Sequence, residues 1–328
     1  MARAIRIHVR GAVYHVMSRG NKGDHVFDYD DDKHTFIKIL GAGVERYGVE
    51  LYVFCIMNNH YHLLLEAPAD NMPAFMQYVG SGYGGYMRRR RGWIGHVFAG
   101  RYKSLCVQKE LYLAALSRYV HLNPVRAEMV GKPEDYSWSS YRGYIGDDDP
   151  PPWLNIDWLL KRHGTQEREA RKKYQAFMEA GMDNPDEYPS EEAIGRAILG
   201  DKKFIEEVVS ATGEERRLGK PSALRFLQGI PDLESLTRAV QDFYGVSRLS
   251  SAPGKDDSRT WRAREMLIWL AKDSTVASNR EIAAVVGSSS RSSIPHQLRR
   301  TRSRLGRNPE ILEHWQKEGG DILTRLKG

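Results

Sequence analysis

Residues 51–66 read LYVFCIMNNHYHLLLE, and the rest of the chain is organised around this stretch. Two apolar runs rich in strand-forming residues flank Asn58-Asn59. Because asparagine tolerates positive φ, the pair predicts the two-residue turn of a β-hairpin, with the second strand starting at His60. Side chains alternate along a strand, so His60 and His62 share one face, roughly 7 Å apart, and Tyr61 occupies the other. Two imidazoles placed in this way can bind one metal ion.

The composition indicates a globular protein with more than one packing unit, since the chain has 328 residues and 41% of them are hydrophobic. No apolar run is long enough to span a bilayer, and the start MARAIRIHVRG lacks the apolar core of a signal peptide. We therefore expect a cytoplasmic protein. Its two cysteines, Cys55 and Cys106, each lie in an apolar run and are predicted to be packing residues, because two isolated thiols make neither a disulfide framework nor a zinc cluster.

Charge is distributed unevenly and divides the chain into three parts. Residues 1–145, 146–257 and 258–328 carry net charges of +6, −6 and +7. The run Asp147–Pro152, DDDPPP, predicts a linker after the first part, and short helices without assigned chemistry are expected in the acidic connector. Two basic domains commonly bind a polyanion, and nucleic acid is the expected one, although charge alone fits a solvated basic surface equally well.

The elements of the first part predict an α+β fold, an antiparallel sheet with packed helices of the ferredoxin-like or RRM-like kind. Four glycines, at positions 80, 82, 84 and 85, fall in the second predicted helix. Each weakens a helix by roughly 1 kcal/mol relative to alanine, which predicts a break or a close approach by another backbone. The expected order is a strand over 11–18, a helix over 30–47, the hairpin, a helix over 73–91, a strand over 96–107 and a helix over 110–121.

A basic and aromatic stretch follows the hairpin and is the predicted contact for single-stranded DNA. An arginine run ends the second helix, and the next predicted strand interleaves basic and aromatic side chains, which suits both the backbone and the bases of a single strand. A solvated helix end is the plainer interpretation of the arginine run. The candidate DNA-binding residues here are Arg88, Arg89, Arg90, Arg91, Arg101 and Lys103.

Tyr119 and Asn123 extend the metal hypothesis into a reaction. Tyr119 lies in the last turn of its predicted helix and Asn123 one turn later on the same face. An amide oxygen beside His60 and His62 fits a hard ion, Mg²⁺ or Mn²⁺, which would polarise a phosphodiester oxygen while Tyr119 acts as a covalent nucleophile. Stacked surface histidines and a core tyrosine are the alternatives. His15, on the first strand, can face the metal, but a lone strand histidine is more often packed or exposed.

The last part of the chain predicts a helix-turn-helix. A helix over 261–271 is followed by a capping box at Ser278–Glu281, a short helix, a Gly287-Ser288 turn and a basic helix starting near Ser292. The basic helix would enter the major groove of duplex DNA. A small helical bundle with a basic face is the alternative. The candidate contacts are Arg291, His296, Arg299 and Arg300.

Three stretches in order resemble the HUH single-tyrosine transposases, and most closely their REP-associated branch. They are CIMNNHYHLLL at 55–65, GHVFAGRYKS at 95–104 and RYVHLNPVRA at 118–127, with a fitting GAVYHV at 11–16, so the resemblance covers about residues 8–145. It implies that His60 and His62 are metal ligands, that Asn123 stands at the third ligand position and that Tyr119 attacks DNA. It also implies cleavage of single-stranded DNA next to hairpins, through a 5′-phosphotyrosine bond and a free 3′-OH. The glycine cluster departs from the family pattern.

The C-terminal helix-turn-helix resembles the DNA-binding domain of the replication initiator DnaA from Arg262 to Arg299, except that Ser288–Arg291 replaces its Gly-Arg-Asp-His stretch. Three functions remain open. The first is a DNA endonuclease and strand transferase, the second a catalytically inactive, transposase-derived DNA-binding regulator, and the third a metal-dependent hydrolase without a covalent intermediate. The resemblance also leaves open whether the protein acts as a monomer or as a homodimer that supplies Tyr119 in trans.

Overall fold

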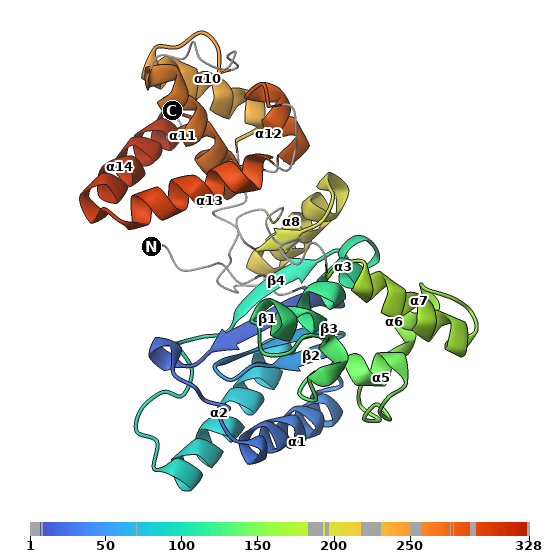
Figure 1. Cartoon of the computed structure of the whole chain (residues 1–328). Helices are drawn as coiled ribbons and strands as arrows, with labels where there is room; N and C mark the ends of the chain where they lie inside the picture. The colour runs from blue at the N-terminus through green and yellow to red at the C-terminus, as the bar shows by residue number, and fades with distance from the viewer. Residues whose placement is uncertain are drawn as a thin grey trace. The chain divides into compact units, whose positions relative to one another are not determined.

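The computed structural model forms two packing units (Figure 1). Of the described residues, those within 7–182 and 197–212 form the N-terminal unit, and residue 193 and those within 213–326 form the C-terminal unit. Among the described residues, no helix combines the length and the apolar character that a membrane span requires. The structure describes residues 7, 9–69, 71–182, 193, 197–217, 231–249, 258–275, 277, 279–288 and 293–326.

The N-terminal unit is built on a five-stranded sheet in the order β2-β3-β1-β4-β5. The first four strands pair antiparallel, as predicted, whereas β5 pairs parallel to β4 and makes the sheet mixed. Only short helices were expected around β5, because two residues are too few to show a strand period. The predicted strand over 96–107 is also shorter, since Lys103–Val107 forms the continuous ladder with β1 and Phe98 makes an isolated bridge with Gly20. The strands are β1 (Ala12–Arg19), β2 (Glu50–Ile56), β3 (His60–Ala67), β4 (Lys103–Val107) and β5 (Ile198–Leu199).

The three long helices predicted for this unit are present, and helix α2 is unbroken despite its glycines. A Cβ at Gly82 would lie 3.2 Å from Cγ2 of Ile39 in α1, so at this position the glycine allows a close approach between helices. The helices are α1 (Asp30–Tyr47), α2 (Met72–Arg91), α3 (Lys109–His121), α4 (Asn123–Arg126), α5 (Tyr141–Ile145), α6 (Asp157–Lys161), α7 (Glu167–Glu179) and α8 (Lys202–Arg217), with 3₁₀ turns η1 (Asn21–Gly23) and η2 (Pro133–Asp135).

Strand alternation gives the sheet two different faces. On one face the Tyr61 ring packs against Phe36 of α1, with ring centroids 4.8 Å apart, and α2 lies beside α1 (Figure 1). On the other face His62 lies beside Tyr119 of α3, with ring centroids 5.8 Å apart. The helix pair α1–α2 and helix α3 therefore cover opposite faces of the sheet.

The hairpin turn is confirmed, but its backbone is not the predicted one. Met57 N donates to His60 O across Asn58-Asn59, so the turn has two residues. Among the described non-glycine residues, positive φ occurs only at Lys22 and Glu128, so neither asparagine uses it. Asn58 O instead accepts from the backbone of residues 26 and 27, and Asn59 O accepts from Gly20 N at 2.7 Å. Tertiary hydrogen bonds set this turn.

Residues that follow the predicted linker pack on the N-terminal unit. The Trp153 ring lies against Phe54 of β2, with centroids 5.9 Å apart, and Asn155 N donates to Leu51 O at 2.8 Å. In α7, the buried Tyr174 hydroxyl lies 2.9 Å from Nδ1 of His121. The predicted boundary near residue 146 thus falls inside one packing unit, because the apolar residues after the prolines return the chain to β2.

Substituting Gly41 tests this packing. A Cβ at Gly41 in α1 would lie 2.8 Å from Cε2 of Trp153. We expect Gly41→Val to lower the free energy of unfolding by about 1–3 kcal/mol, because the valine overpacks the indole site. Chemical denaturation measures this, and the double variant Gly41→Val/Trp153→Ala should recover part of the loss. Strictly additive effects would contradict the contact.

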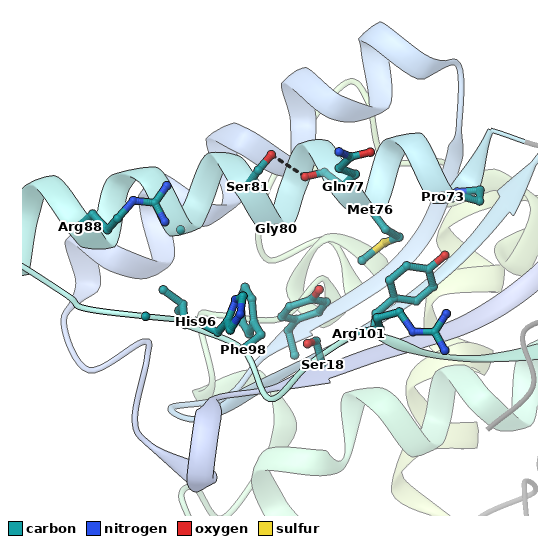
Figure 2. A pocket seen from close by; sticks show the side chains of 16 residues that line it. Ser18, Pro73, Met76, Gln77, Gly80, Ser81, Arg88, His96, Phe98 and Arg101 are labelled. Atoms are coloured by element: carbon teal, nitrogen blue, oxygen red, sulfur yellow. Dashed lines mark hydrogen bonds between the residues drawn. The ribbon is translucent and has the colours of Figure 1, made fainter. Parts of the chain in front are cut away.

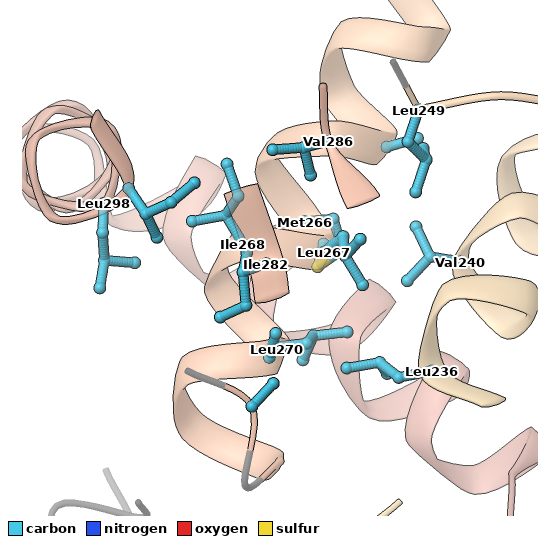
Figure 3. Packing of buried hydrophobic residues seen from close by; sticks show 14 of the residues in the cluster. Leu236, Val240, Leu249, Met266, Leu267, Ile268, Leu270, Ile282, Val286 and Leu298 are labelled. Carbon is cyan, nitrogen blue, oxygen red and sulfur yellow. The ribbon is translucent and has the colours of Figure 1, made fainter. Parts of the chain in front are cut away.

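The described part of the C-terminal unit consists of helices packed around one apolar core (Figure 3). The three predicted helices are present, while Ser278 and Arg291 lie outside the described residues. The last helix, α14, was not predicted. Asn308 caps its N-terminus by accepting a hydrogen bond from Ile311 N at 3.3 Å. Side chains such as Val240, Met266, Ile282 and Leu298 fill the core. The helices are α10 (Leu233–Tyr244), α11 (Ser258–Ser274), α12 (Asn279–Val285), α13 (Ser293–Gly306) and α14 (Pro309–Arg325).

Candidate metal and nucleophile site

Two strand histidines form the first half of the site. His60 and His62 lie on the same face of β3, with ring centroids 5.0 Å apart. His62 is buried and His60 is partly exposed. Asn59 Oδ1 can only accept, so its 2.7 Å contact places the proton of His60 on Nδ1 and leaves the Nε2 lone pair for another partner.

The second half of the site comes from the end of α3. The backbone stays near-helical through Leu122 into α4, so Asn123 remains one turn after Tyr119. The Asn123 amide nitrogen lies 3.0 Å from Nε2 of His62, and Asn123 also hydrogen-bonds to His60. An amide group can present either its oxygen or its nitrogen after rotation. All four predicted chemistry-bearing residues therefore converge at one place.

His15 is a fifth member of the site, and sequence reasoning gave it no definite role. It is fully buried on β1, its ring stacks on that of His62 with centroids 5.1 Å apart, and its Nε2 lies 2.9 Å from Nδ1 of His62. A hydrogen bond to one ring nitrogen fixes the tautomer and direction of the other. His15 thereby holds His62 with Nε2 toward Asn123. The sequence places His15 on a strand of the same predicted sheet. Only the pairing register of β1 with β3 shows that its side chain meets His62.

Burial keeps these imidazoles neutral. It lowers the pKa of His62 well below its ordinary value, the pKa of His15 to about 3 and the pKa of His60 to about 4. Neutral imidazole is the form that binds metal ions. Within the described part of the chain, no group of three or more His, Cys, Asp or Glu side chains could hold a metal ion. With the Asn123 amide as third protein ligand, the set fits a divalent ion.

Arg126 packs directly on the candidate nucleophile. Its guanidinium carbon lies 3.8 Å from the centre of the Tyr119 ring, and Nη2 donates to Tyr119 O at 2.6 Å. Burial raises the pKa of the Tyr119 phenol, and the charge of Arg126 acts in the opposite direction. Sequence reasoning did not assign Arg126 a role. A cation at this place can stabilise both a phenolate and an approaching phosphate.

The predicted DNA-binding residues are not equivalent. Arg91 is bound within the fold, since it pairs with Asp32 and Asp28 and stacks over Tyr29 at 4.5 Å. It is largely covered, unlike its neighbours in the arginine run, because Asp32 is buried and requires a cation. The other described candidates are exposed: Arg88, Arg89, Arg90, Arg101 and Lys103 in the N-terminal unit, and His296, Arg299 and Arg300 on α13.

Part of the chain is similar to a known protein family. Residues 8–123 match the family described as "Transposase IS200 like". Residues 8–123 therefore resemble an IS200-like transposase domain. This domain contains β1, the hairpin and α3, and thus His15, His60, His62, Tyr119 and Asn123. Arg126, helices α5 to α7 and the C-terminal unit lie beyond the matched residues.

Two solved structures are similar to the chain. One is a REP-associated tyrosine transposase bound to a REP hairpin, with 15% identity and a TM-score of 0.38, covering 48% of this chain and 91% of that one. The other is a protein of Deinococcus radiodurans R1 assigned as a transposase, with 21% identity and a TM-score of 0.27, covering 41% and 97%. No curated protein matches the chain.

Proposed function

We propose that this protein cuts and rejoins single-stranded, hairpin-containing DNA through a covalent bond between Tyr119 and a 5′-phosphate. The convergence of His60, His62, Asn123 and Tyr119 carries the proposal. These residues come from β3 and from the successive helices α3 and α4, which are distant from β3 in sequence, and they meet inside the part of the chain that matches IS200-like transposases.

The donor set supports a metal-assisted reaction. His60 and His62, through their Nε2 atoms, and the Asn123 amide would hold Mg²⁺ or Mn²⁺. When bound, such an ion polarises a phosphodiester oxygen and offsets charge in the transition state. His15 and Asn59 keep the two imidazoles in the required tautomers.

The residues of the chain account for the exchange of bonds. The Tyr119 oxygen attacks phosphorus, the new O–P bond replaces the P–O3′ bond, and the phenol proton is lost as the departing O3′ gains one. The products are a 5′-phosphotyrosine and a free 3′-OH. Attack of a 3′-OH on the phosphotyrosine reverses the step, so no nucleotide cofactor is required. Arg126 stabilises the phenolate that the attack needs.

Incubation of the full chain with a single-stranded hairpin and Mn²⁺ tests the proposal. We expect a protein–DNA adduct that survives denaturation, together with a fragment ending in 3′-OH. Binding without cleavage would instead support the inactive, transposase-derived regulator. Cleavage without an adduct would support a hydrolase.

The partners follow from the exposed basic residues. We propose that Arg88, Arg89, Arg90, Arg101 and Lys103 contact the single strand, and that α13 places His296, Arg299 and Arg300 against duplex DNA, as in a helix-turn-helix. The Tyr119 ring lies 5.8 Å from His62 of the same chain, which favours attack in cis over a homodimer that exchanges tyrosines. The helix-turn-helix, its likeness to DnaA and the cytoplasmic location stay predictions.

A further inference from the structure

A groove of about 570 Å³ lies between α2 and residues 95–102, away from the candidate metal site (Figure 2). Ser18 of β1 and Tyr61 of β3 form part of its wall. Ser18 and Tyr61 are directly paired across β1 and β3. Tyr61 lies between His60 and His62 on β3, so its side chain and theirs occupy opposite faces of the sheet. The groove therefore opens on the face of the sheet opposite Tyr119.

Glycine at position 80 keeps the groove open. Gly80 lines the groove from α2, and a Cβ there would meet nothing within 4 Å. It belongs to the glycine cluster that departs from the family pattern. Glycine weakens a helix relative to alanine, yet α2 is continuous here and no neighbouring backbone requires the small residue. Space for a ligand is a physical reason for glycine at this position.

The lining of the groove matches the chemistry of a nucleotide. Met76 and Phe98 provide apolar and aromatic surface, and Arg88 and Arg101 lie at opposite ends (Figure 2). None of the sixteen described lining residues is acidic. Bases of single strands are bound by stacking on aromatic rings and their phosphates by arginines. The volume falls within the range of about 300–1,000 Å³ typical of small-ligand sites.

We infer that this groove binds one unpaired nucleotide of the DNA substrate, with its base against Phe98 and Met76 and its flanking phosphates on Arg88 and Arg101. The inference rests on the proposed function only in taking single-stranded DNA as the substrate. It adds a second DNA site that selects the substrate without taking part in the chemistry at Tyr119.

Filling the groove tests the inference. Fluorescence anisotropy would measure the binding of the full chain to hairpin oligonucleotides in which one unpaired base at a time is replaced by an abasic site. We expect one position at which the abasic site weakens binding about tenfold, and we expect Gly80→Met to remove this discrimination. Ala74→Met is the matched control, because Ala74 is exposed on the same helix and does not line the groove.

The outcomes separate this inference from the proposed function. Thermal melting of Gly80→Met should be no lower than that of the wild type, because methionine favours helix and its Cβ meets open space. If Gly80→Met misfolds, Ser81→Phe, which fills the groove from another exposed lining residue of α2, should remove the same discrimination. At saturating DNA, Gly80→Met should form the Tyr119 adduct at the wild-type rate. Discrimination that persists in the folded Gly80→Met variant, or in Ser81→Phe, would overturn the inference, whether or not the adduct forms.

Discussion

A Tyr119→Phe variant is expected to form no covalent adduct with DNA and to lose at least about 10⁴-fold in cleavage rate, because no other group takes over a missing nucleophile efficiently. Its affinity for the hairpin should stay within about twofold. The phenylalanine ring keeps the packing beneath Arg126, and only the hydroxyl is lost. Denaturing electrophoresis of labelled DNA would measure the adduct, and anisotropy would measure the affinity.

The matched control is Tyr112→Phe, two turns earlier on α3. It removes the same atom from the same helix and should leave adduct formation unchanged. An adduct that persists in Tyr119→Phe, or one that disappears in Tyr112→Phe, would contradict the assignment of Tyr119 as the nucleophile. Cleavage without adduct in Tyr119→Phe would favour a hydrolase.

Replacing His62 is expected to have the second largest effect. His62→Ala should lower the affinity of the DNA-free protein for Mn²⁺ by at least about 100-fold, since even outer-shell partners of metal ligands contribute about 10–100-fold. His62 provides the central contact of the site, with Asn123 at 3.0 Å on Nε2 and His15 at 2.9 Å on Nδ1. Titration calorimetry of the full chain measures this binding, and cleavage should fall with it.

His25→Gln is the control for His62→Ala. His25 is exposed, and its Nδ1 lies 3.1 Å from Oδ1 of Asp28. Its replacement should leave Mn²⁺ affinity unchanged. Equal Mn²⁺ affinities of wild type and His62→Ala would show that the ion binds elsewhere, and the proposed donor set would then be wrong. Because the readout is binding, this test does not depend on the DNA sequence chosen.

Neighbouring arginines of one run have different roles that the sequence does not distinguish. Arg88 and Arg91 belong to one run and look alike in the sequence, yet Arg88 lines the groove and Arg91 neutralises the buried Asp32. The helix period assigns a residue to a side of the helix, but it does not identify the charge that another helix presents there. A partner 59 residues away decides the role of Arg91.

Local rules were sufficient wherever one element decides the outcome. Alternation along β3 puts His60 and His62 on one face, and one turn of near-helical backbone brings Asn123 after Tyr119, so these relations could be read before any fold was known. Only the tertiary structure pairs β1 with β3, which places His15 against His62, and only the tertiary structure forms the groove that Gly80 lines. Periodicity encodes how a residue faces within its own element, whereas the neighbours it meets depend on strand register and helix packing, which arise only when distant segments bury their apolar faces together.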